Sequence, residues 1–284
     1  MAVLAWSGCT KTEPARAPGR VRVLETDVLG LSGLSQDEHG AFWSPGEGAD
    51  AVLRIDPVTF AVTRYPVLGA PEGIDLEALA WVEGTRFIVG TETQEKGRTR
   101  DVILDGRIDG QRFRVAPVGY LEYSYWGITA RANLGIEGIC HVDGALILAT
   151  ELAQEQRGRR WAPLGRFDPN TQAWTAHRVA LTSDDGKLAA IDCHGRGDQI
   201  EVLAVERHFG VSRLLRFDVP GGPEGQWIEP VIVADLSKLV TPLPNFEGLA
   251  WLEDGSAVLV TDNKYRGATS EPTRLYFIPA STIR

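Results

Sequence analysis

Short strand signals repeat along nearly the whole chain and constrain its fold more than any other feature. From residue 30 onward helical periodicity is almost absent, and runs of four to eight strand-forming residues are bounded by Gly, Asp, Asn and Pro. These runs group into five blocks of about fifty residues, beginning near residues 31, 75, 135, 188 and 246. A repeat of this length is typical of a β-propeller, in which each block forms one radial blade.

The number of strands in each block predicts how the ring closes. The first four blocks each contain four strand signals, and the last contains three, ending with residues 274–278. Residues 21–25 supply the missing strand, so that both ends of the chain share one blade and leave no frayed edge. We therefore predict one all-β domain over residues 21–284, a β-propeller with five blades. A six-bladed ring is the alternative if the stretches 92–112 or 152–164 contain extra strands.

Carboxylates recur at one end of the predicted hairpins. The clearest copy joins Asn245-Phe-Glu-Gly-Leu-Ala-Trp251 to Thr261-Asp-Asn263 through Asp254-Gly255. A two-residue type I′ turn at Asp254-Gly255 would place Glu247 opposite Asp262. Counting residues outward from the turn in the same way pairs Glu77 with Glu92, and Glu137 with Glu151.

These hairpin ends are expected to meet at the mouth of a central channel. Innermost strands of a propeller all run the same way, and each second strand returns to the same face. The fourth block is ambiguous, because an alternative alignment puts Ala190 in the place of Asp192. The predicted ring has Ser32, Glu77, Glu137, Asp192 and Glu247 at the first position and Glu47, Glu92, Glu151, Glu206 and Asp262 at the second.

Several carboxylates in a narrow mouth raise one another's pKa unless a cation is present. A hard divalent ion, chiefly calcium, takes oxygen ligands of this kind, and the side chains of Asn245 and Asn263 add amide carbonyls. Alternatively, each Glu accepts hydrogen bonds from the backbone of the adjacent blade and only joins the ring together. The predicted metal ligands are Glu77, Glu92, Glu137, Glu151, Glu206, Glu247, Asp262 and Asn263.

Basic side chains accompany the acids. A cation together with Arg or Lys suits the phosphate or carboxylate group of a small anionic ligand, although each base could simply neutralise its neighbour. The predicted ligand-binding residues are Arg131, Arg207, Lys264 and Arg266. A net charge of −9 argues against binding of nucleic acid.

His208 and Tyr265 are the candidates for acid–base catalysis. The chain has no Gly-x-Ser-x-Gly elbow, no phosphate-binding Gly-rich loop and no His-Glu-x-x-His sequence. Hydrolysis, if the protein catalyses it, would therefore be metal-assisted.

The N-terminal residues 1–20 differ in character from the rest of the chain. Ser7-Gly-Cys9 follows a small apolar run and resembles the end of a lipoprotein signal peptide, in which Cys9 is lipidated. The run is short and lacks a basic leader, which a start codon placed too far downstream would explain. The alternative is an unstructured tail with an incidental Cys. We predict an exported protein of the cell envelope, periplasmic or attached to the membrane only through a lipid.

Two other cysteines, Cys140 and Cys193, are each followed by a His. In an exported protein they could form a disulfide, and otherwise they would be two buried thiols. A zinc site built from the two Cys-His pairs is disfavoured, because neighbouring residues in a strand point to opposite faces.

Several motifs together resemble the bacterial phytase-like propeller family, also called "esterase-like activity of phytase". They are Leu31-Ser-Gly-Leu-Ser35, Asn133-Leu-Gly-Ile-Glu-Gly138 with Leu148-Ala-Thr-Glu151, Leu203-Ala-Val-Glu-Arg207, and Asn245-Phe-Glu-Gly-Leu-Ala250 with Val260-Thr-Asp-Asn263. The resemblance covers roughly residues 30–280 and implies an exported or lipid-anchored β-propeller that binds calcium, with hydrolysis of esters or phosphoesters. Trp43-Ser-Pro-Gly-Glu47 departs from the Ser-Asp-Asp type turn of the family, which puts a ligand in the first blade in question.

A second function competes with this one. The chain could be a non-catalytic propeller scaffold whose loops bind a protein or glycan partner. Tyr123, Tyr125 and Trp126 are the aromatic residues that could form such a surface, although they could equally pack between blades.

Overall fold

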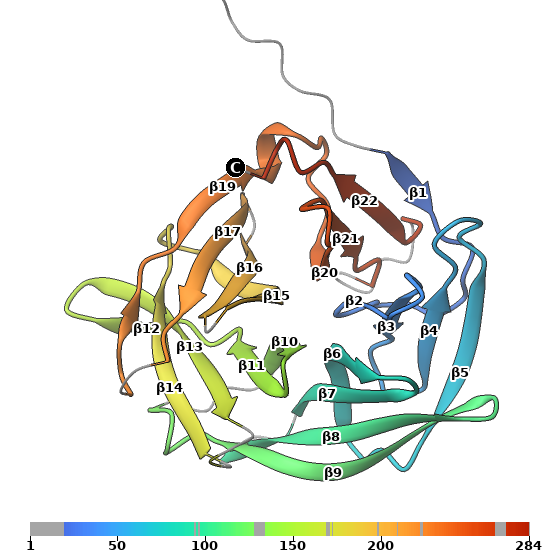
Figure 1. Cartoon of the computed structure of the whole chain (residues 1–284), viewed down its shortest axis with the longest axis horizontal. Helices are drawn as coiled ribbons and strands as arrows, with labels where there is room; N and C mark the ends of the chain where they lie inside the picture. Colours follow the sequence, from blue (N-terminus) through green and yellow to red (C-terminus); the bar gives the residue numbers. More distant parts are fainter. Residues whose placement is uncertain are drawn as a thin grey trace, which may run out of the picture.

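The computed structural model describes residues 20–283 except residues 94, 96, 128–133, 169–170, 172, 198, 209, 222–223 and 265–270. The described chain is almost entirely β-structure, arranged radially around a centre (Figure 1), with one short 3-10 helix, η1 (Leu236–Lys238). The prediction of an all-β propeller is confirmed. No helix in the described part of the chain has the length and apolar character to cross a bilayer.

Two antiparallel groups of strands share one eight-stranded sheet. Strand β5 pairs with β9 in parallel over only two residue pairs, Val67 with Phe113 and Leu68 with Arg114. Because two of the expected units are continuous through this pairing, the number of blades stays a prediction. The groups are β2 (Ser35–Gln36), β3 (Phe42–Pro45), β4 (Ala51–Ile55) and β5 (Val62–Leu68), and β6 (Ile74–Glu83), β7 (Arg86–Thr93), β8 (Arg100–Asp109) and β9 (Arg112–Glu122).

The stretch 152–164, where an extra strand was possible, does contain one, and this strand belongs to the next sheet. Strand β12 (Gln154–Gln156) pairs with β13 in this sheet and does not start another one. The other strands of the sheet are β10 (Ile136–Val142), β11 (Ala145–Thr150), β13 (Arg159–Asp168), β14 (Ala173–Ala180) and β18 (Trp227–Ile228).

The last two sheets each have four strands. One contains β15 (Lys187–Arg196), β16 (Gln199–His208), β17 (Val211–Val219) and β19 (Val231–Asp235). The other contains β20 (Phe246–Trp251), β21 (Ala257–Thr261), β22 (Arg274–Ile278) and β1 (Val21–Val23). Val21 lies opposite Tyr276 and Val23 opposite Arg274, so the predicted closure by the N-terminal strand is confirmed.

The innermost strands are buried on both faces because neighbouring sheets pack against each other. All six residues of β20 are buried, as are the first five of β10. Strands covered on both sides show continuous apolar runs where a half-exposed strand would alternate. Strands β6, β10, β15 and β20 follow one another around the ring centre, each in contact with the next (Figure 1).

Three inner strands carry a β-bulge at the same place, and each bulge holds a glutamate. Register shifts leave Glu77 unpaired between Leu76 and Ala78, Glu137 between Ile136 and Gly138, and Glu247 between Phe246 and Gly248. A bulge inserts one residue and re-aims its side chain, here toward the channel mouth. The fourth inner strand bulges between Leu188 and Ala190, so Ala189 holds this position, and the predictions of Asp192 and Ala190 were both wrong.

The bulges also overturn the predicted hairpin pairs. Glu92 lies opposite Asp75 and not Glu77, while the N–H of Asp262 donates to the carbonyl of Asn245 at 2.9 Å. The predicted two-residue turn at Asp254-Gly255 was wrong as well. The N–H of Leu252 donates to the carbonyl of Ser256 at 2.8 Å, so the loop is longer than two residues.

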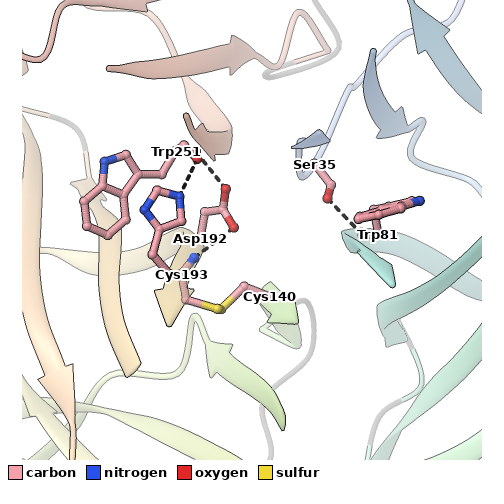
Figure 2. Close-up of a disulfide and its surroundings, with 7 residues drawn as sticks. Ser35, Trp81, Cys140, Asp192, Cys193 and Trp251 are labelled. Carbon is pink, nitrogen blue, oxygen red and sulfur yellow. Dashed lines mark hydrogen bonds between the residues drawn. A yellow bond between two sulfur atoms is a disulfide. The ribbon is translucent and has the colours of Figure 1, made fainter. Parts of the chain in front are cut away.

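Neighbouring inner strands are joined at equivalent positions, as Figure 2 shows. Asp192 Oδ2 accepts a hydrogen bond from the Trp251 N–H at 2.7 Å, and Ser35 Oγ accepts one from the Trp81 N–H at 2.9 Å. Between β10 and β15 the joint is covalent, a disulfide between Cys140 and Cys193 with Cα atoms 5.8 Å apart. The disulfide interpretation is therefore confirmed, and those of two free thiols and of a zinc site were wrong.

Candidate metal centre

The mouth of the ring holds a cavity of about 190 Å³ that is lined by acidic and basic side chains. Seven of its nine lining residues are carboxylic acids and two are bases. They come from the starts of inner strands and the ends of second strands, as the topology requires. The lining consists of Glu47, Asp75, Glu77, Glu92, Glu137, Glu151, Arg207, Glu247 and Lys264.

Three carboxylates converge most closely. Asp75, Glu77 and Glu92 each have an oxygen within 4.8 Å of the other two. Asp75 and Glu92 face each other across β6 and β7, and the bulge adds Glu77 beside them. Backbone N–H groups orient two of the acids, because Gly48 donates to Asp75 Oδ1 at 3.0 Å and Gly135 donates to Glu92 Oε2 at 3.1 Å.

Burial makes ionisation of these acids unfavourable in the absence of a cation. Glu77 and Glu137 are 6% and 7% exposed, and burial raises the pKa of both well above the usual range, with a further increase from neighbouring glutamates. Burial raises the pKa of Glu92 to about 8, against the opposing effects of Arg98 and the Gly135 N–H. A shared positive ion would relieve this repulsion.

On the opposite side of the cavity Glu247 is paired. The guanidinium of Arg207 donates from Nε to Glu247 Oε2 at 3.1 Å and from Nη2 to Glu247 Oε1. Asn245 Nδ2 bridges Glu247 Oε1 at 2.8 Å and Asp262 Oδ2 at 3.0 Å. Glu247 and Asp262 are thus linked through Asn245, although they do not lie directly opposite each other.

Two lysines neutralise acids at the rim. Lys264 Nζ lies 2.8 Å from Glu47 Oε2, and the hydrogen bond to Glu47 raises the pKa of Lys264. Lys187 Nζ lies 3.3 Å from Glu151 Oε1.

The structure brings together five of the eight predicted metal ligands. Glu77, Glu92, Glu137, Glu151 and Glu247 line the cavity, and their role as ligands stays a prediction. The other three do not line it. Glu206 accepts hydrogen bonds from the Thr182 N–H at 3.1 Å and from Ser183 Oγ at 2.9 Å. The bulge of its hairpin holds Ala189 and not an acid.

Asp262 and Asn263 line a neighbouring pocket of about 620 Å³ instead. Asn263 Oδ1 accepts a hydrogen bond from the Gly30 N–H at 3.0 Å, so this amide joins the last sheet to the chain before β2.

Of the predicted ligand-binding residues, Arg207 and Lys264 line the cavity. Arg131 and Arg266 lie outside the described residues, as do Tyr265 and Cys9. His208 ends β16, is half-buried and does not line the cavity, and burial lowers its pKa.

Sequence reasoning missed one acid that lines the cavity, and it left the role of a second in question. Asp75 was overlooked although it stands two residues before Glu77, the spacing that puts two strand side chains on one face. Glu47 was left in question because its turn departs from the family motif, yet it lines the cavity together with Lys264.

Comparisons with known proteins agree with this architecture. The model of a family described as phytase-like, esterase-like activity of phytase, matches residues 46–265. No functionally curated protein matches the sequence significantly.

Solved structures show the same fold at low identity. The PQQ-bound aldose sugar dehydrogenase of Streptomyces coelicolor is 14% identical with a TM-score of 0.51, covering 92% of this chain and 99% of its own. The GH43B protein of a xyloglucan locus of Bacteroides ovatus is 16% identical with a TM-score of 0.53, covering 92% of this chain and 54% of its own. A putative glucose dehydrogenase of Thermus thermophilus is 12% identical with a TM-score of 0.50, covering 91% of this chain and 99% of its own.

Proposed function

Because the chain belongs to the phytase-like family, we propose that it binds calcium at the acidic mouth and hydrolyses a phosphoester or ester there. The observation that carries the proposal is the convergence of Asp75, Glu77 and Glu92, whose oxygens lie within 4.8 Å of one another. A shared cation would stabilise the ionised form of carboxylates held this close, two of which, Glu77 and Glu92, are buried.

The donor set fits calcium better than a transition metal. Calcium takes six to eight oxygen ligands in flexible geometry, whereas zinc and copper favour nitrogen and sulfur. None of the described residues lining the cavity is His or Cys. Asp75, Glu77, Glu92 and Glu137 would hold the first ion, and Glu151 and Glu247 complete the acidic wall.

The charge of the cavity supports an anionic substrate only when calcium is present. Seven acids against two bases would repel a phosphate or carboxylate. Bound calcium would supply a positive charge that polarises the substrate oxygen and lowers the pKa of water. Lys264 and Arg207 stand at the same cavity and would orient the anion, Arg207 while still held by Glu247.

Export to an oxidising compartment is part of the proposal. The Cys140–Cys193 disulfide is of the kind that persists outside the cytosol. We propose that Cys9 carries the lipid and that residues 10–20 form a tether to the cell envelope, without a role in nucleic-acid binding.

Calcium titration of chelator-treated protein tests the proposal. We expect calcium to raise the melting temperature, because a ligand that binds only the folded state stabilises it. Glu77→Gln should lower calcium affinity at least about tenfold, which corresponds to about 1.4 kcal/mol. Glu253→Gln is the matched control, because Glu253 is an exposed acid at the far end of the hairpin that carries Glu247.

Hydrolysis is tested separately with aryl phosphates and aryl esters. We expect turnover that needs calcium and that falls in Glu77→Gln but not in Glu253→Gln. Calcium binding without any such turnover would agree with the proposed metal centre but refute the proposed hydrolysis.

A further inference from the structure

A second pocket lies at the outer part of the sheet that contains β10 to β14 and β18, where β13 and β14 stand away from the ring centre (Figure 1). Its volume is about 450 Å³, within the range of about 300–1,000 Å³ that small-molecule sites occupy. It is built from the segment after β9, strand β12, parts of β13 and β14, and Glu224-Gly225 before β18. None of its lining residues belongs to the metal centre.

Three aromatic rings line this pocket and are held in place. Tyr125 is 50% exposed, and its hydroxyl donates to the Trp174 carbonyl at 2.8 Å. The ring of Trp126 lies against Gly165, where a Cβ atom would come within 1.5 Å of it. Trp161 packs against Trp227, with ring centroids 6.4 Å apart. The pocket therefore offers preformed apolar faces, with Tyr125 as the accessible one.

Polar atoms in the lining lack partners among the described residues. His177 is 1% exposed, and neither of its ring nitrogens has a hydrogen-bond partner there. Burial lowers the pKa of His177, so the neutral ring offers one donor and one acceptor. The buried indole N–H of Trp161 is a further donor without a described partner. Buried groups of this kind call for a ligand or ordered water that both donates and accepts.

The charges around the pocket argue against an ionic ligand. Glu155 and Glu224 would repel a phosphate or carboxylate, and the guanidinium of Arg178 partly offsets them. Arg178 lies 5.4 Å from the centroid of the Trp161 ring, so a cation already covers that aromatic face. A neutral ligand with one apolar face and many hydroxyl groups satisfies all of these features, and Gln154 and Gln156 add amide donors and acceptors at the rim.

We propose that this pocket binds a neutral carbohydrate, one or two sugar rings of a glycan, stacked on Tyr125 and hydrogen-bonded to the polar lining. The site is independent of the metal centre. It would allow a propeller with a metal centre at its central mouth, as proposed above, to be held on a glycan by its rim.

Titration of the full chain with neutral mono- and disaccharides, followed by calorimetry and tryptophan fluorescence, tests the proposal. We expect saturable binding that persists in chelator. Tyr125→Ala should weaken it at least about tenfold, because stacking on the ring is lost. Tyr125→Phe keeps the ring and should bind within about threefold of the wild type.

Tyr120→Ala is the matched control, because Tyr120 is a 43% exposed aromatic on β9 outside the pocket. Gln154→Ala is a second test, independent of whether Tyr125→Ala folds, and should also weaken binding. The proposal is overturned if no sugar binds below about 10 mM, or if the affinities of Tyr125→Ala and Gln154→Ala equal that of the wild type. It is also overturned if chelator abolishes binding, which would place the sugar at the metal centre, or if only quaternary ammonium compounds bind.

Discussion

Arg207 of β16 and Glu247 of β20 form a buried ion pair between neighbouring sheets, in which two guanidinium nitrogens contact the two carboxylate oxygens. Arg207 Nε also donates to the Phe246 carbonyl at 3.0 Å. One side chain thus neutralises an acid of the cavity and attaches the next inner strand.

Removal of this arginine should be costly when calcium is absent. Arg207→Met leaves the buried carboxylate of Glu247 without its cationic partner, and we expect a loss of about 3–5 kcal/mol in the free energy of unfolding. Urea denaturation in chelator measures it. The double variant with Glu247→Gln should recover much of the loss, and an unchanged midpoint in Arg207→Met alone would show that the pair contributes nothing.

Calcium-free protein should lose stability as the pH rises. The pKa of Glu92 is about 8 in the folded protein against an ordinary 4.5, so the folded state holds its proton more tightly than the unfolded chain. The resulting stabilisation is complete below about pH 4.5 and is lost as the pH rises through about 8. We expect the melting temperature in chelator to fall by at least about 4 °C across this window.

Two controls accompany the pH series. Saturating calcium should flatten it, because the ion favours the ionised acids. Glu92→Gln should also reduce the slope in chelator. A melting temperature that instead increases with pH in chelator would contradict the charge arrangement described for the mouth.

The disulfide should contribute more to the free energy of unfolding than the hydrogen bond between Ser35 and Trp81, which occupies the equivalent position between two other inner strands. Cys140 and Cys193 are 53 residues apart in sequence, and opening a loop of that length costs about 2–5 kcal/mol. The variant with Cys140→Ser and Cys193→Ser should lose this amount in urea unfolding. Ser35→Ala removes only the bond to the Trp81 N–H and should cost about 1 kcal/mol. Equal losses in the two variants would refute this ranking.

The sequence predicted the parts of the architecture that follow from local patterns. Strand signals, turn residues and the short final block were enough to predict the ring and its closure by Val21 against Tyr276. The gathering of Glu77, Glu137 and Glu247 also followed, because parallel inner strands begin at one face whatever their register.

The registers could not be obtained in the same way. Counting outward from a turn assumes that residues pair one to one, and a bulge breaks that assumption without changing composition. Asp75 was therefore missed as the partner of Glu92, and Ala189 as the counterpart of Glu77. Glu206 accepts hydrogen bonds from Thr182 and Ser183 and does not line the cavity. These contacts cannot be found by counting residues along a hairpin.

The glycine that follows a bulged glutamate provides the most specific test of how the ring is assembled. A Cβ atom on Gly248 would lie 2.5 Å from the backbone carbon of Gly33 and 2.6 Å from its oxygen. The Gly33 N–H donates to the Glu247 carbonyl at 2.9 Å, so β20 and the segment before β2 cannot separate without losing this bond. The Cβ contacts on the Gly33 side are backbone atoms, which cannot rotate away as a flexible side chain would.

Gly248→Ala should therefore push the last inner strand away from the first and displace Glu247. We expect a loss of about 1–3 kcal/mol in unfolding free energy and weaker calcium binding in the same variant. Gly119→Ala is the matched control, because a Cβ there would meet only Ile103 at 3.9 Å, and it should change stability by less than about 0.5 kcal/mol. If the two alanine variants unfold alike and bind calcium alike, close contact between these strands does not set the position of Glu247.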